Sequence, residues 1–153
     1  MTHLQNAMIF HSWQDYAISP LTGTIVFTNG CFDVLHMGHV TYLKESRELG
    51  DALVIGLNSD SSVSKLKGSD RPVNSWNHRA YVLAGLRYVD AIIKFEEDTP
   101  LELIKAIRPD IITKGGDYQG REMIGGDFVE SYGGKVRILS FVSGCSTTEM
   151  LNK

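Results

Sequence analysis

The sequence reads TIVFTNGCFDVLHMGH over residues 24–39, and this stretch decides the predicted fold. Residues 24–27 are mostly apolar and β-branched, which is typical of a strand. Residues 40–48, VTYLKESRE, follow with a helical pattern. His36 and His39 therefore lie where a strand leads into a helix. Such a junction gathers free backbone N–H groups and the positive end of the helix dipole, so it favours the binding of phosphate.

The residues between and around the two histidines support this interpretation. Gly38 has no side chain, so a phosphate can come close to the backbone there. The imidazoles of His36 and His39 add two donors whose charge can change near neutral pH. Two alternatives to phosphate binding remain. The histidines could be ordinary residues at a helix start, or they could bind a metal, for which the sequence offers no third ligand nearby.

The composition is that of an ordinary globular protein, with 42% hydrophobic and 22% charged residues among 153. The net charge of −3 argues against a general nucleic-acid binder. No apolar run approaches the roughly 18 residues of a membrane span, and the N-terminus does not resemble a signal peptide. Two cysteines make no disulfide framework, so we expect a reducing cytoplasm. No cysteine or histidine cluster has the spacing of a zinc site, so no protein-bound metal is expected.

Apolar strands alternate with helical stretches along the chain. Strands are predicted at residues 24–28, 52–57, 91–95, 110–113 and 136–141. Helices are predicted at about 38–48, 60–67, 75–87, 100–107 and 125–132, with a last short helix from Ser146. Thr99 is expected to cap the fourth of these, with Pro100 at its first position. The alternation predicts an α/β fold, a Rossmann-like doubly wound sheet of about five parallel strands with helices on both faces.

The chain is expected to form a single domain over residues 1–153, with residues 1–22 packed on it as an N-terminal extension. In that extension Ile9-Phe10 could form an edge strand and Ser12 could cap a short helix.

Ligands of such sheets bind beyond the carboxyl ends of the strands. Four polar segments fall at that edge, namely residues 29–39, 58–60, 114–118 and 143–148. We therefore expect one ligand site, built from segments that are far apart in the sequence.

His36-Met37-Gly38-His39 has the form His-x-Gly-His, and other short motifs accompany it along the chain. They are Thr28–Asp33 (TNGCFD), Lys67-Gly68 with Arg71-Pro72, Val89-Asp90, FEEDTP at 95–100, KGGDY at 114–118 and Ser146-Thr147-Thr148. The first motif resembles the signature of the nucleotidyltransferase superfamily. The whole set, from Ile25 to Leu151, resembles one family, the D-glycero-β-D-manno-heptose 1-phosphate adenylyltransferases.

That family makes ADP-activated heptose for lipopolysaccharide or other surface glycans, often as the C-terminal half of a bifunctional kinase–adenylyltransferase. The resemblance implies transfer of AMP from ATP to the sugar 1-phosphate, with Mg²⁺ bound through the ATP phosphates. It also implies a homodimer or higher homo-oligomer and, for a stand-alone chain, a separate heptose kinase in the same pathway. We expect no nucleic-acid or membrane partner.

The resemblance also implies roles for particular residues. The catalytic set is His36, His39 and Lys67, with Lys65 as the alternative lysine over the α-phosphate. The nucleotide-binding set is Asn29, Gly30, Cys31, Phe32, Gly38, Arg79, Lys114, Gly115, Gly116, Asp117, Ser146, Thr147 and Thr148. Arg79 is expected near the terminal phosphates, whereas Asp33 is expected to orient the histidine turn.

Two other functions remain open. A cytidylyltransferase acting on a polyol phosphate, such as glycerol 3-phosphate, is similar in the His-x-Gly-His and Ser-Thr-Thr motifs but lacks KGGDY and FEEDTP. A non-catalytic nucleotide-binding module has no need of the histidine pair, so the combination of two histidines with Lys67 and Ser146 argues against it.

Overall fold

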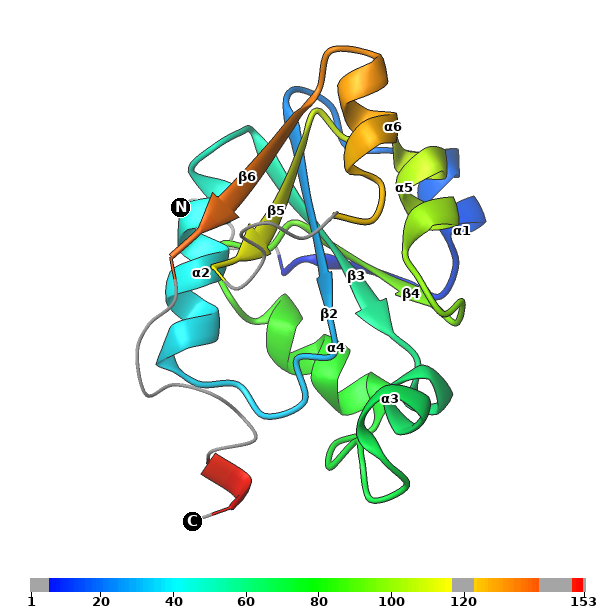
Figure 1. Ribbon diagram of the computed structural model, residues 1–153, viewed down its shortest axis with the longest axis vertical. Coiled ribbons are helices and arrows are strands. Elements are labelled where there is room, and N and C mark those ends of the chain that lie inside the picture. Colours follow the sequence, from blue (N-terminus) through cyan, green and yellow to red (C-terminus); the bar gives the residue numbers. More distant parts are fainter. Residues whose placement is uncertain (1–5, 117–122, 141–149, 153) are drawn as a thin grey trace.

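The computed structural model describes residues 6–116, 123–140 and 150–152. Six strands and six helices lie in this described part (Figure 1). In chain order they are β1 (Met8–Phe10), α1 (Trp13–Ile18), β2 (Ile25–Gly30), α2 (Met37–Arg47), β3 (Ala52–Asn58), α3 (Asp60–Lys67), α4 (Trp76–Ala84), β4 (Ala91–Phe95), α5 (Leu101–Ile107), β5 (Ile111–Gly115), α6 (Gly126–Ser131) and β6 (Lys135–Leu139). Residues 150 and 151 form a further helical turn.

The strands form one sheet in the order β1-β4-β3-β2-β5-β6, and every pairing is parallel. The predicted α/β, Rossmann-like sheet is thus confirmed, with six strands in place of about five. The additional strand is β1, where Met8 to Phe10 pair with Ala91 to Ile93. The expected edge strand at Ile9-Phe10 is thus confirmed, and the structure adds that it pairs with β4.

Helices cover both faces of the sheet, as Figure 1 shows, with α2 and α4 on one face and α1, α5 and α6 on the other. Neighbouring strand residues alternate between these layers. Val26 of β2 belongs to the buried cluster of Leu43 in α2, whereas Phe27 belongs to that of Leu103 in α5. Because both faces of β3 are covered, this strand is buried at every position and is apolar from Ala52 to Leu57.

Helix boundaries differ from the predictions by up to three residues, and two of these differences concern the helix caps. α4 ends at Ala84, three residues early, and Gly85 follows as its C-cap. α5 begins at Leu101, so Pro100, and not Thr99 as the sequence predicts, occupies the N-cap position. The Thr99 hydroxyl accepts only a long hydrogen bond, 3.5 Å, from the N–H of Leu101. The expected Ser12 cap of α1 is present, since its hydroxyl accepts from the N–H of Asp15 at 3.2 Å.

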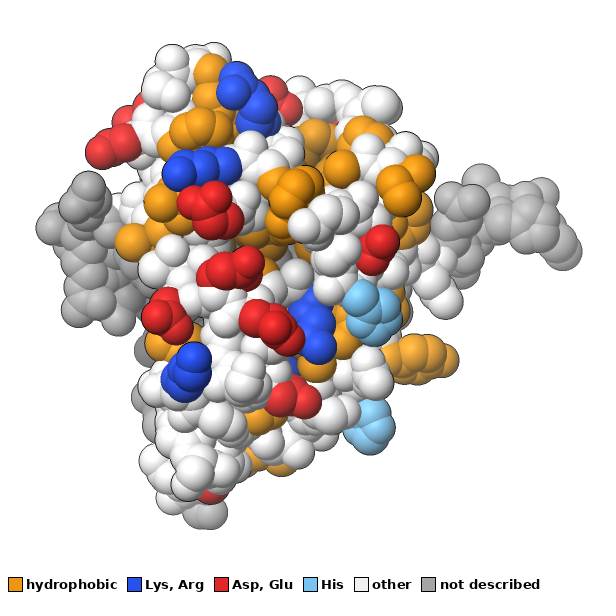
Figure 2. Space-filling model, turned by 90° about the vertical axis from the view of Figure 1, so that its right-hand side faces the viewer, with side chains coloured by type: hydrophobic (Ala, Val, Ile, Leu, Met, Phe, Trp, Pro, Cys, Tyr) orange, Lys and Arg blue, Asp and Glu red, His pale blue; other side chains and the backbone are white. Residues whose placement is uncertain are grey.

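Figure 2 shows the face that α1, α5 and α6 form, where acidic side chains gather across the middle. Glu96, Glu97 and Asp98 are exposed beside the start of α5, where carboxylates interact favourably with the helix dipole. Negative charge on this face disfavours phosphates there. None of the helices in the described ranges is long and apolar enough to cross a membrane.

The sheet has its topological switch point between β2 and β5, where the chain continues to one side through β3 and β4 and returns on the other through β5 and β6. β2 and β5 pair through Val26↔Ile111 and Phe27↔Ile112 alone, against six pairs between β2 and β3. Beyond them, the Thr28 hydroxyl donates to the Thr113 carbonyl at 3.3 Å. The two strands therefore separate toward their carboxyl ends, which is where ligands of such sheets bind.

Hydrogen bonds between hydroxyl groups join α2 to β2 and β5 at the point where these two strands separate. The Tyr42 hydroxyl lies 2.7 Å from that of Thr28 and 3.0 Å from that of Thr113, and the Ser46 hydroxyl lies 2.9 Å from Thr113. Hydrogen bonding satisfies these polar groups inside the protein and so fixes the helix that follows the histidine turn.

Candidate active site

The two histidines form the cap of α2. His36 is the N-cap residue, and its Nδ1 accepts from the N–H of Gly38 at 3.1 Å. His39 is the third helical residue, and its Nδ1 accepts from the N–H of His36 at 3.2 Å. This is a capping box made of imidazoles, whose rings stack with centroids 3.9 Å apart. Since each Nδ1 accepts, the proton of each neutral ring lies on Nε2, and both rings offer an Nε2–H donor.

Both imidazoles are neutral at pH 7 in this arrangement. Burial lowers the pKa of His39 from 6.5 to about 4, with further lowering by His36 and Lys67. Burial also lowers the pKa of His36. The expectation that the charge of His39 changes near neutral pH is therefore wrong for the ligand-free protein, because the sequence could not show how far the ring is buried.

The low pKa of His39 predicts a loss of stability in mild acid. In the unfolded chain His39 takes up a proton near pH 6.5, whereas in the folded protein it resists protonation down to about pH 4. The free energy of unfolding should therefore fall as the pH falls through this window, because the unfolded state binds more protons. Urea titrations between about pH 7 and 4 should show a steeper fall for the wild type than for His39→Gln. Parallel curves would contradict the expectation.

Gly30 and Phe32 determine the packing next to His39. Phe32 adopts a left-handed backbone conformation with φ of 45°, and its ring packs against that of His39 with centroids 5.5 Å apart. A Cβ on Gly30 would lie 2.9 Å from the Phe32 ring, so glycine is needed for this packing. Phe32 is buried at 8% exposure, so its contribution to a ligand site is to hold His39 in place.

Lys114 and Asn29 meet at the switch point, from the carboxyl ends of β5 and β2. The Lys114 ammonium donates to the side-chain oxygen of Asn29 at 2.5 Å. Burial lowers the pKa of Lys114 to about 8, against a smaller opposing effect of Cys31. Burial in turn raises the pKa of the Cys31 thiol, so this thiol stays protonated. A Cβ on Gly115 would meet no atom of the described residues within 4 Å.

Lys65 and Lys67 lie in the last turn of α3, and both are exposed. The ammonium of Lys67 is close enough to lower the pKa values of both His39 and Cys31. The structure therefore places Lys67 within electrostatic reach of His39 although the two are about 30 residues apart in the sequence.

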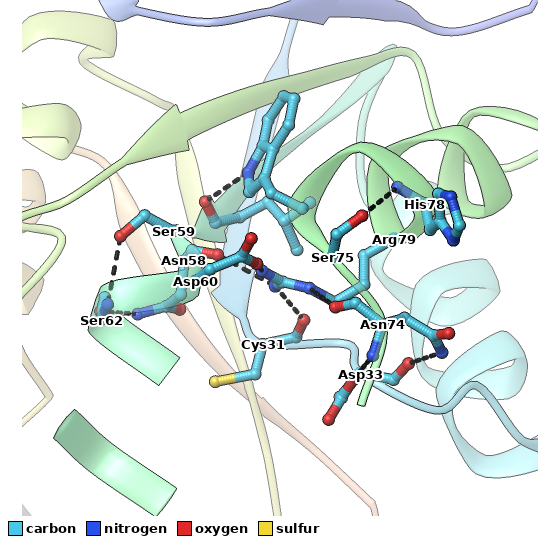
Figure 3. Close-up of polar contacts among 12 residues, drawn as sticks. Cys31, Asp33, Asn58, Ser59, Asp60, Ser62, Asn74, Ser75, His78 and Arg79 are labelled. Atoms are coloured by element: carbon cyan, nitrogen blue, oxygen red, sulfur yellow. Dashed lines mark hydrogen bonds and ion pairs between the residues drawn. The ribbon is translucent and has the colours of Figure 1, made fainter. Parts of the chain in front are cut away.

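Arg79 lies inside the protein, with 2% of its surface exposed. Figure 3 shows its side chain directed between Cys31, Asn58, Asp60 and Asn74. Protein oxygens surround its guanidinium, whereas the family resemblance implied a place near the terminal phosphates. Nothing in the sequence pattern of α4 indicated this burial, and Asp60 was expected only as part of the polar segment 58–60 at the ligand-binding edge.

Asp33 anchors the segment that follows the lysines. Its carboxylate accepts from the N–H groups of Val73 and Asn74 at 2.7 and 2.9 Å and from Arg71 at 2.8 Å. Burial alone would raise the pKa of Asp33, but these donors hold it below its ordinary value. Its carboxylate is thus engaged by the protein. Among the described residues, no group of three histidine, cysteine or acidic side chains could hold a metal ion.

Four expected site residues, Asp117 and Ser146-Thr147-Thr148, lie outside the described residues. The structure brings together the others near the carboxyl ends of β2, β3 and β5, with Arg79 behind them.

A parallel sheet that separates at its switch point, next to a helix start with two imidazole donors, defines a class: α/β proteins that bind phosphorylated ligands at that edge. Within this class the chain belongs to the cytidylyltransferase-like family, whose model matches residues 27–135.

Curated relatives include the bifunctional protein HldE of a Nitratiruptor species, 56% identical over 129 residues. The protein of the same name from Pseudomonas paraeruginosa is 53% identical over 129 residues. Each match covers 84% of this chain but 27% of the relative, so the chain spans about a quarter of their length.

Solved structures give two further comparisons. The lipopolysaccharide core biosynthesis protein of Thermoplasma volcanium is 33% identical, with a TM-score of 0.64 over 79% of this chain and 98% of that one. Pantoate-β-alanine ligase of Francisella tularensis is 14% identical, with a TM-score of 0.65 over 88% of this chain and 67% of that one, and shows the shared fold alone.

Proposed function

We propose that the chain transfers AMP from ATP to D-glycero-β-D-manno-heptose 1-phosphate, giving ADP-heptose and pyrophosphate for lipopolysaccharide or other surface glycans. The observation that carries this proposal is the pair of neutral imidazoles at the start of α2, with their Nε2–H donors and the nearby Lys67. The identity of 53–57% to several proteins named HldE and the motif set shared with the heptose enzymes support the choice of sugar.

In the proposed reaction an oxygen of the sugar phosphate forms a bond to the α-phosphorus of ATP. The bond from this phosphorus to the β-phosphate breaks, and pyrophosphate leaves with the electron pair. Since two anions must meet, catalysis consists mainly of positioning and charge stabilisation. His36 and His39 would donate from Nε2 to the oxygens of the α-phosphate, and Lys67 would reduce the repulsion.

The nucleotide would occupy the separation between β2 and β5. The lack of a side chain at Gly115, and at Gly116 after it, leaves room for adenine against the backbone, and Asn29 and Lys114 line the floor. Asp117 would bind the ribose, and Ser146, Thr147 and Thr148 would bind the β- and γ-phosphates, as the family resemblance implies.

Magnesium is proposed to enter with ATP, held by its phosphates and by water. This suits the described residues, because Asp33 is engaged by N–H donors and Asp60 by Arg79. The ion would neutralise phosphate charge. The chain's own contribution is to orient the α-phosphate between the imidazoles and Lys67.

Because ATP is the donor, we expect the reaction to take place in the cytoplasm. We expect a homodimer or higher homo-oligomer to catalyse it. A heptose kinase would supply the sugar 1-phosphate, either as a separate protein or within a longer chain.

A pyrophosphate-release assay tests the proposal by crossing ATP and CTP with heptose 1-phosphate, other sugar 1-phosphates and glycerol 3-phosphate. We expect kcat/KM for ATP with the heptose substrate to exceed that for CTP by at least about tenfold, because a base read by buried hydrogen bonds excludes its competitor. Preference for CTP and glycerol 3-phosphate would replace the proposal by the cytidylyltransferase alternative. Nucleotide binding without release would favour the non-catalytic module.

A further inference from the structure

We propose that Arg79 is a positioning residue, which holds the histidine turn and the lysine-bearing helix in their relative places and does not bind the nucleotide phosphates. This inference rests on the proposed function, since it concerns the geometry of that same site. It assigns to Arg79 and Asp60 a role that the motifs did not indicate.

The guanidinium of Arg79 joins three segments of the chain, namely the loop at Cys31, the junction of β3 and α3 at residues 58–60, and the residue Asn74 before α4 (Figure 3). Nη1 donates to the carbonyls of Cys31 and Asn58 at 2.8 and 2.9 Å. Nε donates to the carbonyl of Asn74 at 3.0 Å, and Nη2 donates to the Asp60 carboxylate at 2.7 Å. Four of the five N–H groups are thus directed at protein oxygens, in a side chain that is 1% exposed.

Each of these bonds reaches a segment that leads to the site. Cys31 belongs to the loop that carries the histidine pair, and Asn58 ends β3. Asp60 is the first residue of α3, whose last turn carries Lys67. Asn74 precedes the Ser75 cap of α4. The planar guanidinium of Arg79 therefore connects the start of α3, the helix that carries Lys67, to the backbone of the loop that precedes the histidine pair.

Asp33 provides a second attachment between the loop that follows β2 and the segment that contains α3. It lies in the histidine loop, with its side chain 1% exposed, and binds Arg71 together with the backbone of Val73 and Asn74. The segment 61–70, which contains both lysines, is thus held at each end to the loop that follows β2. A shift of the segment against the histidines would break buried hydrogen bonds at one end or the other.

A lysine cannot replace this arginine. The guanidinium is a planar fork that reaches several acceptors at once, whereas an ammonium is a compact point charge with three donors. In Arg79→Lys the charge remains, but several of the buried carbonyls lose their donor. The substitution therefore separates a geometric role from a general need for positive charge.

The test compares Arg79→Lys with Arg87→Lys, a matched change at an exposed arginine outside the network. Turnover is measured with ATP and the sugar 1-phosphate, ATP affinity is measured directly, and hydrogen exchange is followed in the ligand-free protein. We expect Arg79→Lys to lower kcat by at least about tenfold, since a misplacement of about 1 Å can cost up to 10²-fold. KM and Kd for ATP should change less than about threefold, and exchange should rise at residues 31–33 and 57–61.

Three outcomes would overturn the proposal. A loss of ATP affinity that accounts for the loss of activity, with unchanged exchange, would make Arg79 a phosphate ligand. A lower melting temperature with wild-type kcat would make its role structural only. If Arg79→Lys has the same kcat as Arg87→Lys, Arg79 has no role in the reaction.

If Arg79→Lys does not fold, Asp60→Ala decides, because Asp60 is half-exposed and its loss leaves three of the four bonds. Increased exchange at residues 57–61 with lower kcat and unchanged KM would support the proposal, and wild-type kcat would overturn it. The exchange measurement needs no turnover, so a failure of the proposed reaction remains distinguishable from a failure of this inference.

Discussion

Replacing His39 by glutamine should lower kcat by about 10²–10³-fold, the loss typical when one preorganised donor to a developing oxyanion is removed. The affinity for ATP should change much less. The imidazole is expected to stabilise the transition state more than the bound substrate, so its removal should act on kcat and not on KM.

Glutamine is the informative replacement because of the double role of His39. Its Nδ1 accepts from the N–H of His36 and so completes the cap of α2. Glutamine is common at this third helical position and can accept the same hydrogen bond. Alanine cannot, and loss of a cap costs about 0.5–2 kcal/mol of stability. His39→Gln therefore removes the Nε2–H donor while it keeps the helix start.

The same design applies to His36, where asparagine is a favourable N-cap residue that lacks the imidazole. Melting temperatures close to that of the wild type, together with a large fall in kcat, would establish the donor role for each histidine. Near-normal turnover in both folded variants would exclude it and leave the histidines as capping residues alone.

Replacing Lys67 by alanine should lower kcat/KM by roughly 10²-fold, as expected for a cation that stabilises charge on a transferring phosphoryl group. Lys65→Ala is the matched control, because both lysines are exposed in the last turn of the same helix. We expect it to stay within about threefold of the wild type, since it is Lys67 that lies close enough to affect His39 and Cys31.

Binding should also order the segment that carries these lysines. Residues 65–70 are exposed, whereas Asp33 and Arg79 hold the flanking residues. Hydrogen exchange at 65–70 should slow when an ATP analogue and Mg²⁺ bind, and Lys67→Ala should reduce this protection. Equal losses of activity in the two lysine variants would refute the choice of Lys67, and unchanged exchange would refute closure over the phosphates.

The sequence by itself determined the local features of this protein. Apolar runs such as that of β3 predicted buried parallel strands, because both faces of such a strand must be apolar. The histidine pair was placed at a helix start by the residues on either side of it, and the structure shows that helix beginning at Met37. These features depend on neighbours within a few residues, which a sequence displays directly.

Only the tertiary structure decided which groups are buried and which partners they have. Arg79 was expected at the phosphates, yet its guanidinium bonds to residues up to 48 positions away. The pKa of His39 follows from its burial. Burial and long-range hydrogen bonds arise from packing between distant segments, and no local pattern in the sequence records them.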